Sequence, residues 1–375
     1  MKGSVRKRGD KWSYYFTIGV VDGKRKIKEK GGFRTKKEAQ TALREALADF
    51  ETQGFVQQKS DYTLYEFIEY WYETVAKTYL KPTTLDLYFF IMQNYLKEEI
   101  GTIKLNKITP VILQNFLSNK QQNGLSSGSV QNLKKVLNNA LKLAVKQGYI
   151  KTNPLSSVEI RNKSTSNEKR VLSKTEIESI LNEVRNTKYY IPYVVALHTG
   201  MRLGEILALT WDDVDLENNR IYINKTLIVY NKNQLSFSTP KTQSSNRDIL
   251  ITQELKEILL DWKMKQPMII QNMGYSIPKD EYVCTDEKGD LLNPRQFSAR
   301  TSVFVKRTGV SFKFHDFRHT HATMLLESGV NAKIVQERLG HSNISTTLGI
   351  YSHVTKFGEE EAISKFQQHL KHLPS

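Results

Sequence analysis

The chain has 375 residues, of which 39% are hydrophobic, and this is enough for two or three domains that each bury a core. Its 55 Lys and Arg exceed its 39 Asp and Glu, and the formal charge of +16 favours a polyanionic partner, with nucleic acid as the leading candidate over a membrane surface. A lone cysteine excludes a disulfide framework, and the lack of a long apolar run or a signal peptide predicts a cytoplasmic protein without a membrane partner.

The first fifty residues concentrate basic side chains, with 14 Lys or Arg against 6 Asp or Glu. Alternating apolar residues at 12–20 predict a strand with one buried face, and two more strands, the last ending near Phe33, are expected after it. TKKE at 35–38 has the spacing of a capping box, which predicts a helix through about Phe50. Residues 1–55 should therefore form a small module whose basic face either contacts phosphate or is only solvated.

Helical signals run from 61 to 155, where we expect four or five helices. One should begin after the capping box at 63–66 and another after the Thr109–Pro110 pair. An apolar stripe at every fourth position favours helix core over a ligand groove, and it comprises Leu133, Leu137, Leu141 and Val145. The polar run 161–169 predicts a linker, so a third domain is expected at 170–375.

This third region is mixed, with helices on both sides of a strand-rich stretch, and it carries several polar motifs. HTGMRLGEI contains Arg202, with Glu205 one turn later on the same helical face, although such an arginine alone is more often an ion-pair residue. Lys241 lies in STPKTQ between two expected strands, where a solvated lysine is the simpler interpretation. LGHSNISTTLGIY places Tyr351 ten residues after His341. A tyrosine alone is usually a core or interface residue.

The stretch HDFRHTHATMLLESG predicts a helix whose first turns are polar and whose later turns are apolar. His315 and Arg318 lie three residues apart and should share a face of it. A zinc site would use His315 and His319, but HExxH is absent and the single cysteine offers no pair of sulfur ligands. Taken alone, the segment is most simply the polar start of a buried helix.

Together, two arginines, two histidines, a lysine and a tyrosine in a basic protein describe attack on a phosphodiester. Guanidinium groups match the charge and geometry of the non-bridging oxygens. A tyrosine can join covalently to phosphorus, while a lysine or histidine can move a proton to or from the reacting oxygens. Such a transesterification conserves the energy of the broken bond, so we expect neither cofactor nor metal.

These motifs resemble the tyrosine recombinase (phage integrase) family, in the branch carried by temperate phages and integrative conjugative elements. HxxR at 315–318, LGH at 339–341 and the tyrosine in IYSHV match its carboxyl-terminal signature, while HTGMRLGEI and TPKT match its first arginine box and its lysine hairpin. The resemblance spans the whole chain. It implies a multidomain α+β protein with three parts: an arm-site DNA-binding module of a three-stranded sheet and a helix, an all-α SAM-like core-binding domain, and a mixed, mainly α catalytic domain.

The resemblance also implies how the reaction would proceed. Tyr351 would be the nucleophile that forms a 3′-phosphotyrosyl bond. Arg202 and Arg318 would clamp the scissile phosphate. Lys241 would be the general acid for the 5′ hydroxyl.

The same resemblance gives His315 and His341 catalytic roles and Glu205 a supporting role. His341 would hydrogen-bond the transition state. His315 would be either a general base or a further phosphate contact, and both remain open. Glu205 would support Arg202. His319 and His321 lie outside the family's catalytic set and are assigned to packing or support.

The implied function is integration, and also excision, of a mobile element or prophage in a bacterial host. The implied partners are double-stranded DNA at core and arm sites and three further copies in a homotetramer, with a directionality factor and a host DNA-bending protein as candidates.

The apolar positions Ala362, Ile363, Phe366 and Leu370 predict a terminal helix that packs on its own domain or docks on a neighbouring protomer. A resolvase-type recombinase, a type IB topoisomerase and an inactive DNA-binding regulator are the alternatives.

Overall fold

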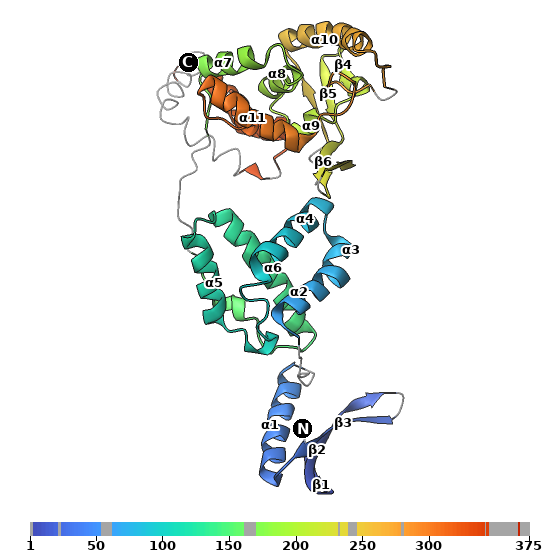
Figure 1. Cartoon of the computed structure of the whole chain (residues 1–375), viewed down its shortest axis with the longest axis vertical. Coiled ribbons are helices and arrows are strands. Elements are labelled where there is room, and N and C mark those ends of the chain that lie inside the picture. Colours follow the sequence, from blue (N-terminus) through green and yellow to red (C-terminus); the bar gives the residue numbers. More distant parts are fainter. Residues whose placement is uncertain are drawn as a thin grey trace, which may run out of the picture. The chain divides into compact units, whose positions relative to one another are not determined.

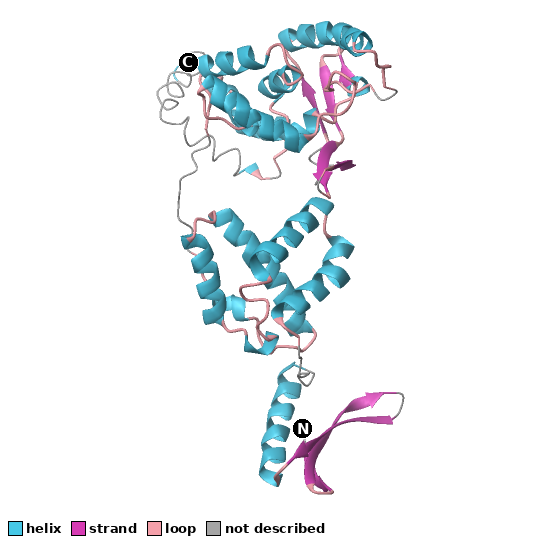
Figure 2. Cartoon of the chain, viewed as in Figure 1, coloured by secondary structure: helices cyan, strands magenta, loops and turns pink. Residues whose placement is uncertain are grey.

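The computed structural model describes residues 3–21, 24–53, 62–160, 170–231, 233–238, 246–278, 281–341, 343–344 and 367. Helices are the main element of these residues, and strands occur in two parts of the chain (Figure 2). Contacts divide the chain into Met1–Thr165 and Ser166–Ser375. The first unit contains a small sheet module and a helical domain, and the second is the mixed domain.

The amino-terminal module is an antiparallel sheet in the order β1-β2-β3, followed by a helix (Figure 1). Its elements are β1 (Gly3–Arg8), β2 (Lys11–Val21), β3 (Lys24–Phe33) and α1 (Lys36–Gln53). Tyr14 and Phe16 on β2 bury their rings against Leu43 and Ala46 of α1. The alternation of apolar residues on β2 thus has the predicted cause: one face of the strand is buried against a core.

The prediction of two strands after β2 was wrong. One continuous strand, β3, lies there, and the third strand is β1, whose polar sequence GSVRKR has no apolar alternation to mark it. The register between β2 and β3 steps from Trp12–Phe33 to Ser13–Gly31, which makes Gly32 the extra residue of a bulge. Its φ of 99° is one that glycine adopts without strain.

The helical domain consists of four main helical runs, as predicted, joined by short turns. Its elements are α2 (Leu64–Trp71), the π-helical η1 (Tyr72–Ala76), α3 (Lys77–Tyr79), α4 (Pro82–Ile91), the π-helical η2 (Met92–Leu96), η3 (Leu105–Lys107), α5 (Pro110–Gln122), α6 (Ser127–Lys146) and η4 (Pro154–Ser157). Both predicted starts are confirmed: the Thr63–Glu66 capping box is complete, and Thr109 caps α5. Of the predicted stripe, Leu133, Leu137 and Leu141 are fully buried in the core, and Val145 packs against it partly buried.

The mixed domain packs helices around two small sheets, in the orders β4-β5-β8 and β6-β7. Its elements are α7 (Lys174–Val184), α8 (Tyr190–Thr199), α9 (Leu203–Ile206), η5 (Trp211–Asp213), β4 (Val214–Asp215), β5 (Arg220–Ile223), β6 (Thr226–Tyr230), β7 (Gln234–Ser238), β8 (Arg247–Leu250), α10 (Gln253–Asn272), α11 (Pro294–Thr308), α12 (Phe314–Glu327) and α13 (Ala332–Leu339). The predicted capping box at Ser173 opens α7. α12 lies against α8, and α13 lies against α12 and β8.

Two left-handed glycines end the helices that frame the arginine-bearing segments. Gly200 (φ 68°) follows α8, and Gly340 (φ 66°) follows α13. A helix that ends in this way turns its last carbonyls away from its own axis, so that they can accept bonds from other elements. The predicted helix over HDFRHTHATMLLE is confirmed as α12.

Candidate active site

Arg318 is held in the interior of the mixed domain by two backbone carbonyls. Its Nη1 donates to the Gly200 oxygen at 2.7 Å and its Nη2 to the Leu339 oxygen at 2.6 Å. The residue is only 2% exposed. Burial, followed by the charge of Arg202, lowers the pKa of Arg318 to about 9, so the guanidinium still carries its charge at neutral pH.

Arg202 lies at the start of α9, and the carboxylate of Glu205 bonds both its backbone and its side chain. The Glu205 carboxylate accepts from the Arg202 backbone N–H at 2.9 Å and from its Nη1 at 2.7 Å. Arg202 Nη2 donates to the Gly340 oxygen at 3.0 Å. The Arg202 side chain is 40% exposed, so solvent or a ligand can still reach a guanidinium that is already positioned.

Arg247, at the start of β8, completes this cluster, and the sequence motifs did not predict it. Its Nη2 donates to Glu205 Oε2 at 2.9 Å and its Nε to the Arg338 oxygen at 2.7 Å. Burial by itself would raise the pKa of Glu205, but the bonds and charge of Arg247, with those of Arg202, lower it below its usual range. Glu205 is therefore an anion shared by two guanidinium groups.

His321 and Arg338 connect α12 to α13 beneath the cluster. The His321 Nδ1 lies 2.8 Å from the Leu197 carbonyl, which can only accept, and Arg338 Nε donates to His321 Nε2 at 3.1 Å. His321 is therefore a neutral imidazole with its proton on Nδ1. Burial, followed by the charge of Arg338, lowers the pKa of His321 to about 4. The assignment of His321 to structural support agrees with these contacts.

The two predicted catalytic histidines lie at helix ends, one at the start of α12 and the other after the turn that ends α13. His315 is exposed on the first turn of α12, and its ring packs edge-on against that of His319, with centroids 4.7 Å apart. His341 directly follows the Gly340 turn, where its backbone N–H donates to the Gln336 oxygen at 3.1 Å. Lys241 and Tyr351 lie outside the described residues. The structure thus brings Arg202, Glu205 and Arg318 together around the segment that leads into His341.

Within the described ranges, no three His, Cys, Asp or Glu side chains gather as a metal site. The helices searched there include none that is both long and apolar enough to span a membrane.

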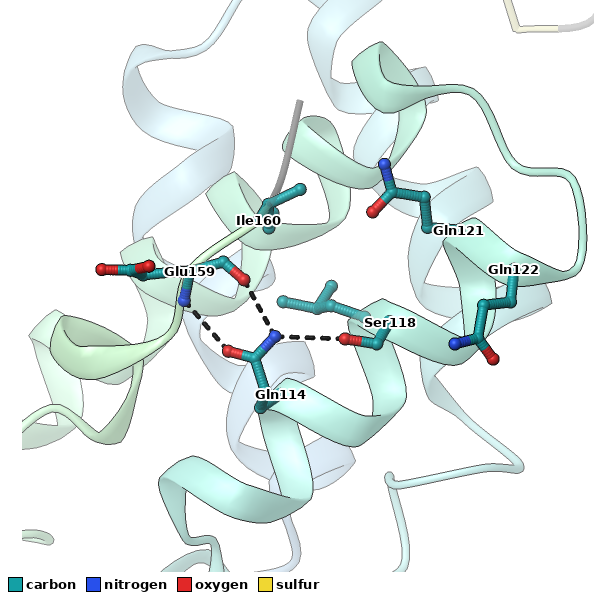
Figure 3. A pocket seen from close by; sticks show the side chains of 7 residues that line it. Gln114, Ser118, Gln121, Gln122, Glu159 and Ile160 are labelled. Atoms are coloured by element: carbon teal, nitrogen blue, oxygen red, sulfur yellow. Dashed lines mark hydrogen bonds between the residues drawn. The ribbon is translucent and has the colours of Figure 1, made fainter. Parts of the chain in front are cut away.

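A pocket in the helical domain lies where the chain leaves that domain. It lies beside α5, and its lining comprises Gln114, Leu117, Ser118, Gln121, Gln122, Glu159 and Ile160 (Figure 3). The Gln114 amide donates to the Glu159 oxygen at 2.8 Å and accepts from its N–H at 3.0 Å. The pocket therefore surrounds a fixed point of the backbone just before residue 161, and Gln114 is engaged in that anchor.

Family models match three consecutive parts of the chain. The model described as the phage integrase family matches residues 170–357, an arm DNA-binding domain matches residues 4–50, and the amino-terminal SAM-like domain of phage integrases matches residues 63–121.

Two curated proteins resemble nearly the whole chain. A "tyrosine recombinase XerC-like" protein of Caldanaerobacter subterraneus subsp. tengcongensis is 31% identical over 356 residues, covering 90% of this chain and 91% of that protein. The integrase of Staphylococcus phage L54a is 30% identical over 371 residues, covering 92% and 98%.

Solved structures share the fold. The Tn1549 transposon integrase in complex with transposon right end DNA has a TM-score of 0.68 and 22% identity, covering 82% of this chain and 99% of that one. A lambda integrase tetramer bound to a Holliday junction has a TM-score of 0.57 and 19% identity, covering 92% and 94%.

Proposed function

Because the chain belongs to the phage integrase family of tyrosine recombinases, site-specific enzymes that cut and rejoin DNA strands, we propose that Arg202 and Arg318 hold the scissile phosphate and that Tyr351 attacks it. The observation that carries this proposal is the convergence of both guanidinium groups on the end of α13. A charge-bearing fork held before substrate arrives stabilises the extra negative charge of the transition state without reorganising at that moment.

The remaining roles are those that the family resemblance implies, and they suit the chemistry of each group. Lys241 donates the proton that the leaving 5′ oxygen needs, and His341 donates a hydrogen bond to a non-bridging oxygen. His315 is exposed at the start of α12, beside the turn that carries Arg318, and it serves as a base or as a further phosphate contact. Glu205 orients Arg202 through the bonds described above and takes no part in bond making.

The test of these roles is strand cleavage on a nicked core-site duplex, which traps the covalent intermediate. Arg202→Ala and Arg318→Ala should each lower single-turnover cleavage by about 100-fold or more, since each removes donors to the developing charge. The matched control is Arg307→Ala, which removes an exposed arginine paired with Glu183 in the same domain. Cleavage by either active-site variant at the control's rate would contradict the clamp.

The domain limits 1–55, 61–155 and 170–375 are proposed as an arm-site binding module, a core-binding domain and the catalytic domain. The basic charge of the first fifty residues and the antiparallel β1-β2-β3 sheet suit binding in the major groove, which admits a β-ribbon. Removal of residues 1–55 should weaken arm-site binding and leave cleavage of an isolated core site intact. Equal arm-site affinity with and without the module would contradict the assignment.

The proposed cellular role is integration and excision of a mobile element in the bacterial cytoplasm, by a homotetramer on two core sites. A directionality factor and a host DNA-bending protein are proposed as further partners. The carboxyl-terminal stretch with Ala362, Ile363, Phe366 and Leu370 lies outside the described residues, and we propose that it docks on a neighbouring protomer. Truncation after Val354 should then leave cleavage intact and abolish the four-protomer complex on native gels, whereas intact assembly would contradict the docking.

A further inference from the structure

Arg247 is buried beside the two clamp arginines, although no motif marks it. We propose that Arg247 is a positioning residue for strand cleavage, holding Glu205 and the carboxyl end of α13 so that Arg202 and Arg318 are in place for the phosphate. The inference rests on the proposed roles of those two arginines. Because Arg247 is almost fully buried and bonds to Glu205 and to the Arg338 oxygen, its effect is exerted through these protein partners.

Three consecutive carbonyls at the end of α13 each accept from a different arginine. The Arg338 oxygen accepts from Arg247 at 2.7 Å, the Leu339 oxygen from Arg318 at 2.6 Å, and the Gly340 oxygen from Arg202 at 3.0 Å. Carbonyls at this end of a helix lack helical partners and carry the negative end of its dipole, so they attract cations. The end of α13 therefore sets the spacing of all three guanidinium groups.

Arg247 fixes that helix end by packing as well as by its hydrogen bond. A Cβ added at Gly340 would lie 3.0 Å from Arg247 Nη1 and 3.3 Å from its Cδ, so the left-handed turn rests directly on the arginine side chain. The Arg247 side chain is only 7% exposed. Without it, the Arg338 oxygen would lose its donor, and the turn that bonds Arg202 would lose its support.

Arg247 also limits how far Glu205 neutralises the positive charge of Arg202. Glu205 accepts from Arg202 at 2.7 Å and from Arg247 at 2.9 Å, so one carboxylate is divided between two cations. Without Arg247, Glu205 would be paired with Arg202 alone. It would then neutralise more of the positive charge that Arg202 presents to the phosphate. The defect should then appear in the chemical step and not in DNA affinity, which depends on many phosphate contacts.

The experiment compares Arg247→Gln with Arg307→Gln in the full-length chain. Both substitutions remove one positive charge and one ion pair, but the Arg307–Glu183 pair is on the surface of α11. Single-turnover covalent adduct formation on a nicked core-site duplex gives the cleavage rate, and titration of the same duplex gives the affinity. We expect Arg247→Gln to slow cleavage by roughly 10- to 100-fold while its affinity matches that of the control.

Arg247→Lys keeps the inference testable if the glutamine variant does not fold. It retains the charge, but a single ammonium cannot span both Glu205 and the Arg338 oxygen, so cleavage should be slowed by less than in Arg247→Gln, roughly 3- to 10-fold. Wild-type cleavage rates in both variants, or a parallel loss of affinity and cleavage, would overturn the inference while leaving the proposed function intact. A wild-type protein that binds core DNA without ever forming an adduct would overturn both.

Discussion

The Arg318 guanidinium donates to the Gly200 carbonyl at 2.7 Å across 118 positions of the chain. This bond joins the first turns of α12 to the left-handed turn that ends α8. The second bond of Arg318, to the Leu339 oxygen, adds α13 to the same point. A side chain held by two elements other than its own is oriented before DNA arrives, which is the condition for electrostatic stabilisation without reorganisation.

Gly200→Ala should therefore damage both stability and cleavage. A Cβ at Gly200 would lie 2.5 Å from Leu339 Cδ2 and 2.7 Å from His321 Cδ2, and the φ of 68° disfavours any side chain. We expect a loss of about 2–4 kcal/mol in the free energy of unfolding, from the strained backbone together with overpacking. Urea denaturation measures that loss, and adduct formation on core DNA measures the displacement of Arg318.

Gly309→Ala is the matched control, because Gly309 also ends a helix with a φ of 71° but would place its Cβ in open space. It should lose only about 1 kcal/mol, the backbone cost alone, and should cleave like the wild type. Equal losses from the two alanines would show that the contacts of Gly200 with α12 and α13 contribute nothing.

Arg318→Lys is predicted to fail despite keeping the positive charge. A lysine cannot donate to both the Gly200 and Leu339 oxygens and also present a planar fork to phosphate. Cleavage should fall by about 100-fold or more, and an unsatisfied buried carbonyl should cost about 1–3 kcal/mol. Single-turnover kinetics and urea denaturation report the two effects, with the exposed Arg300→Lys on α11 as the control. A lysine variant that cleaves within a few-fold of the wild type would contradict the fork.

The stability of the mixed domain should depend on pH through His321. Its pKa is lowered to about 4 in the folded chain and lies near 6.5 when unfolded, so between these values the unfolded state binds the extra proton. The stability that the neutral imidazole contributes is complete above about 6.5 and is lost as the pH falls toward 4, by about 3 kcal/mol in all.

The comparison with His321→Gln isolates this effect from the carboxylates, which titrate in both proteins. The difference in urea midpoint between the wild type and the variant should shrink steadily as the pH falls from 7 toward 4. Parallel midpoints across that range would mean that His321 does not titrate with folding.

Local features of the site were predictable, and contacts between distant segments were not. The pairing of Arg202 with Glu205 follows from their spacing of three on a helix, and the structure has it at 2.7 Å. The spacing of His315 and Arg318 also predicted a shared face, but it could not tell that His315 is exposed while Arg318 is buried. That difference comes from α8 and α13, which cover the Arg318 side of α12.

Arg247 and β1 show which features of the structure sequence patterns do not predict. A single arginine in a short strand has no periodicity or motif that distinguishes it from a surface residue, and its importance arises only where β8 meets α9 and α13. The sequence of the polar β1 strand shows no apolar alternation; backbone pairing with β2 holds the strand, and its Val5 packs against the core of the module. Patterns of side chains predict elements that bury their own apolar face, whereas elements held by backbone bonds leave little trace in the sequence.

The most direct test of the account is covalent capture of labelled core DNA by the wild type and by Tyr351→Phe, resolved on denaturing gels. We expect an adduct joined to the 3′ phosphate in the wild type, and none in the phenylalanine variant, with equal DNA binding by the two proteins. An adduct of equal yield in Tyr351→Phe, or one joined to a 5′ end, would contradict the proposed nucleophile and the chemistry built on it.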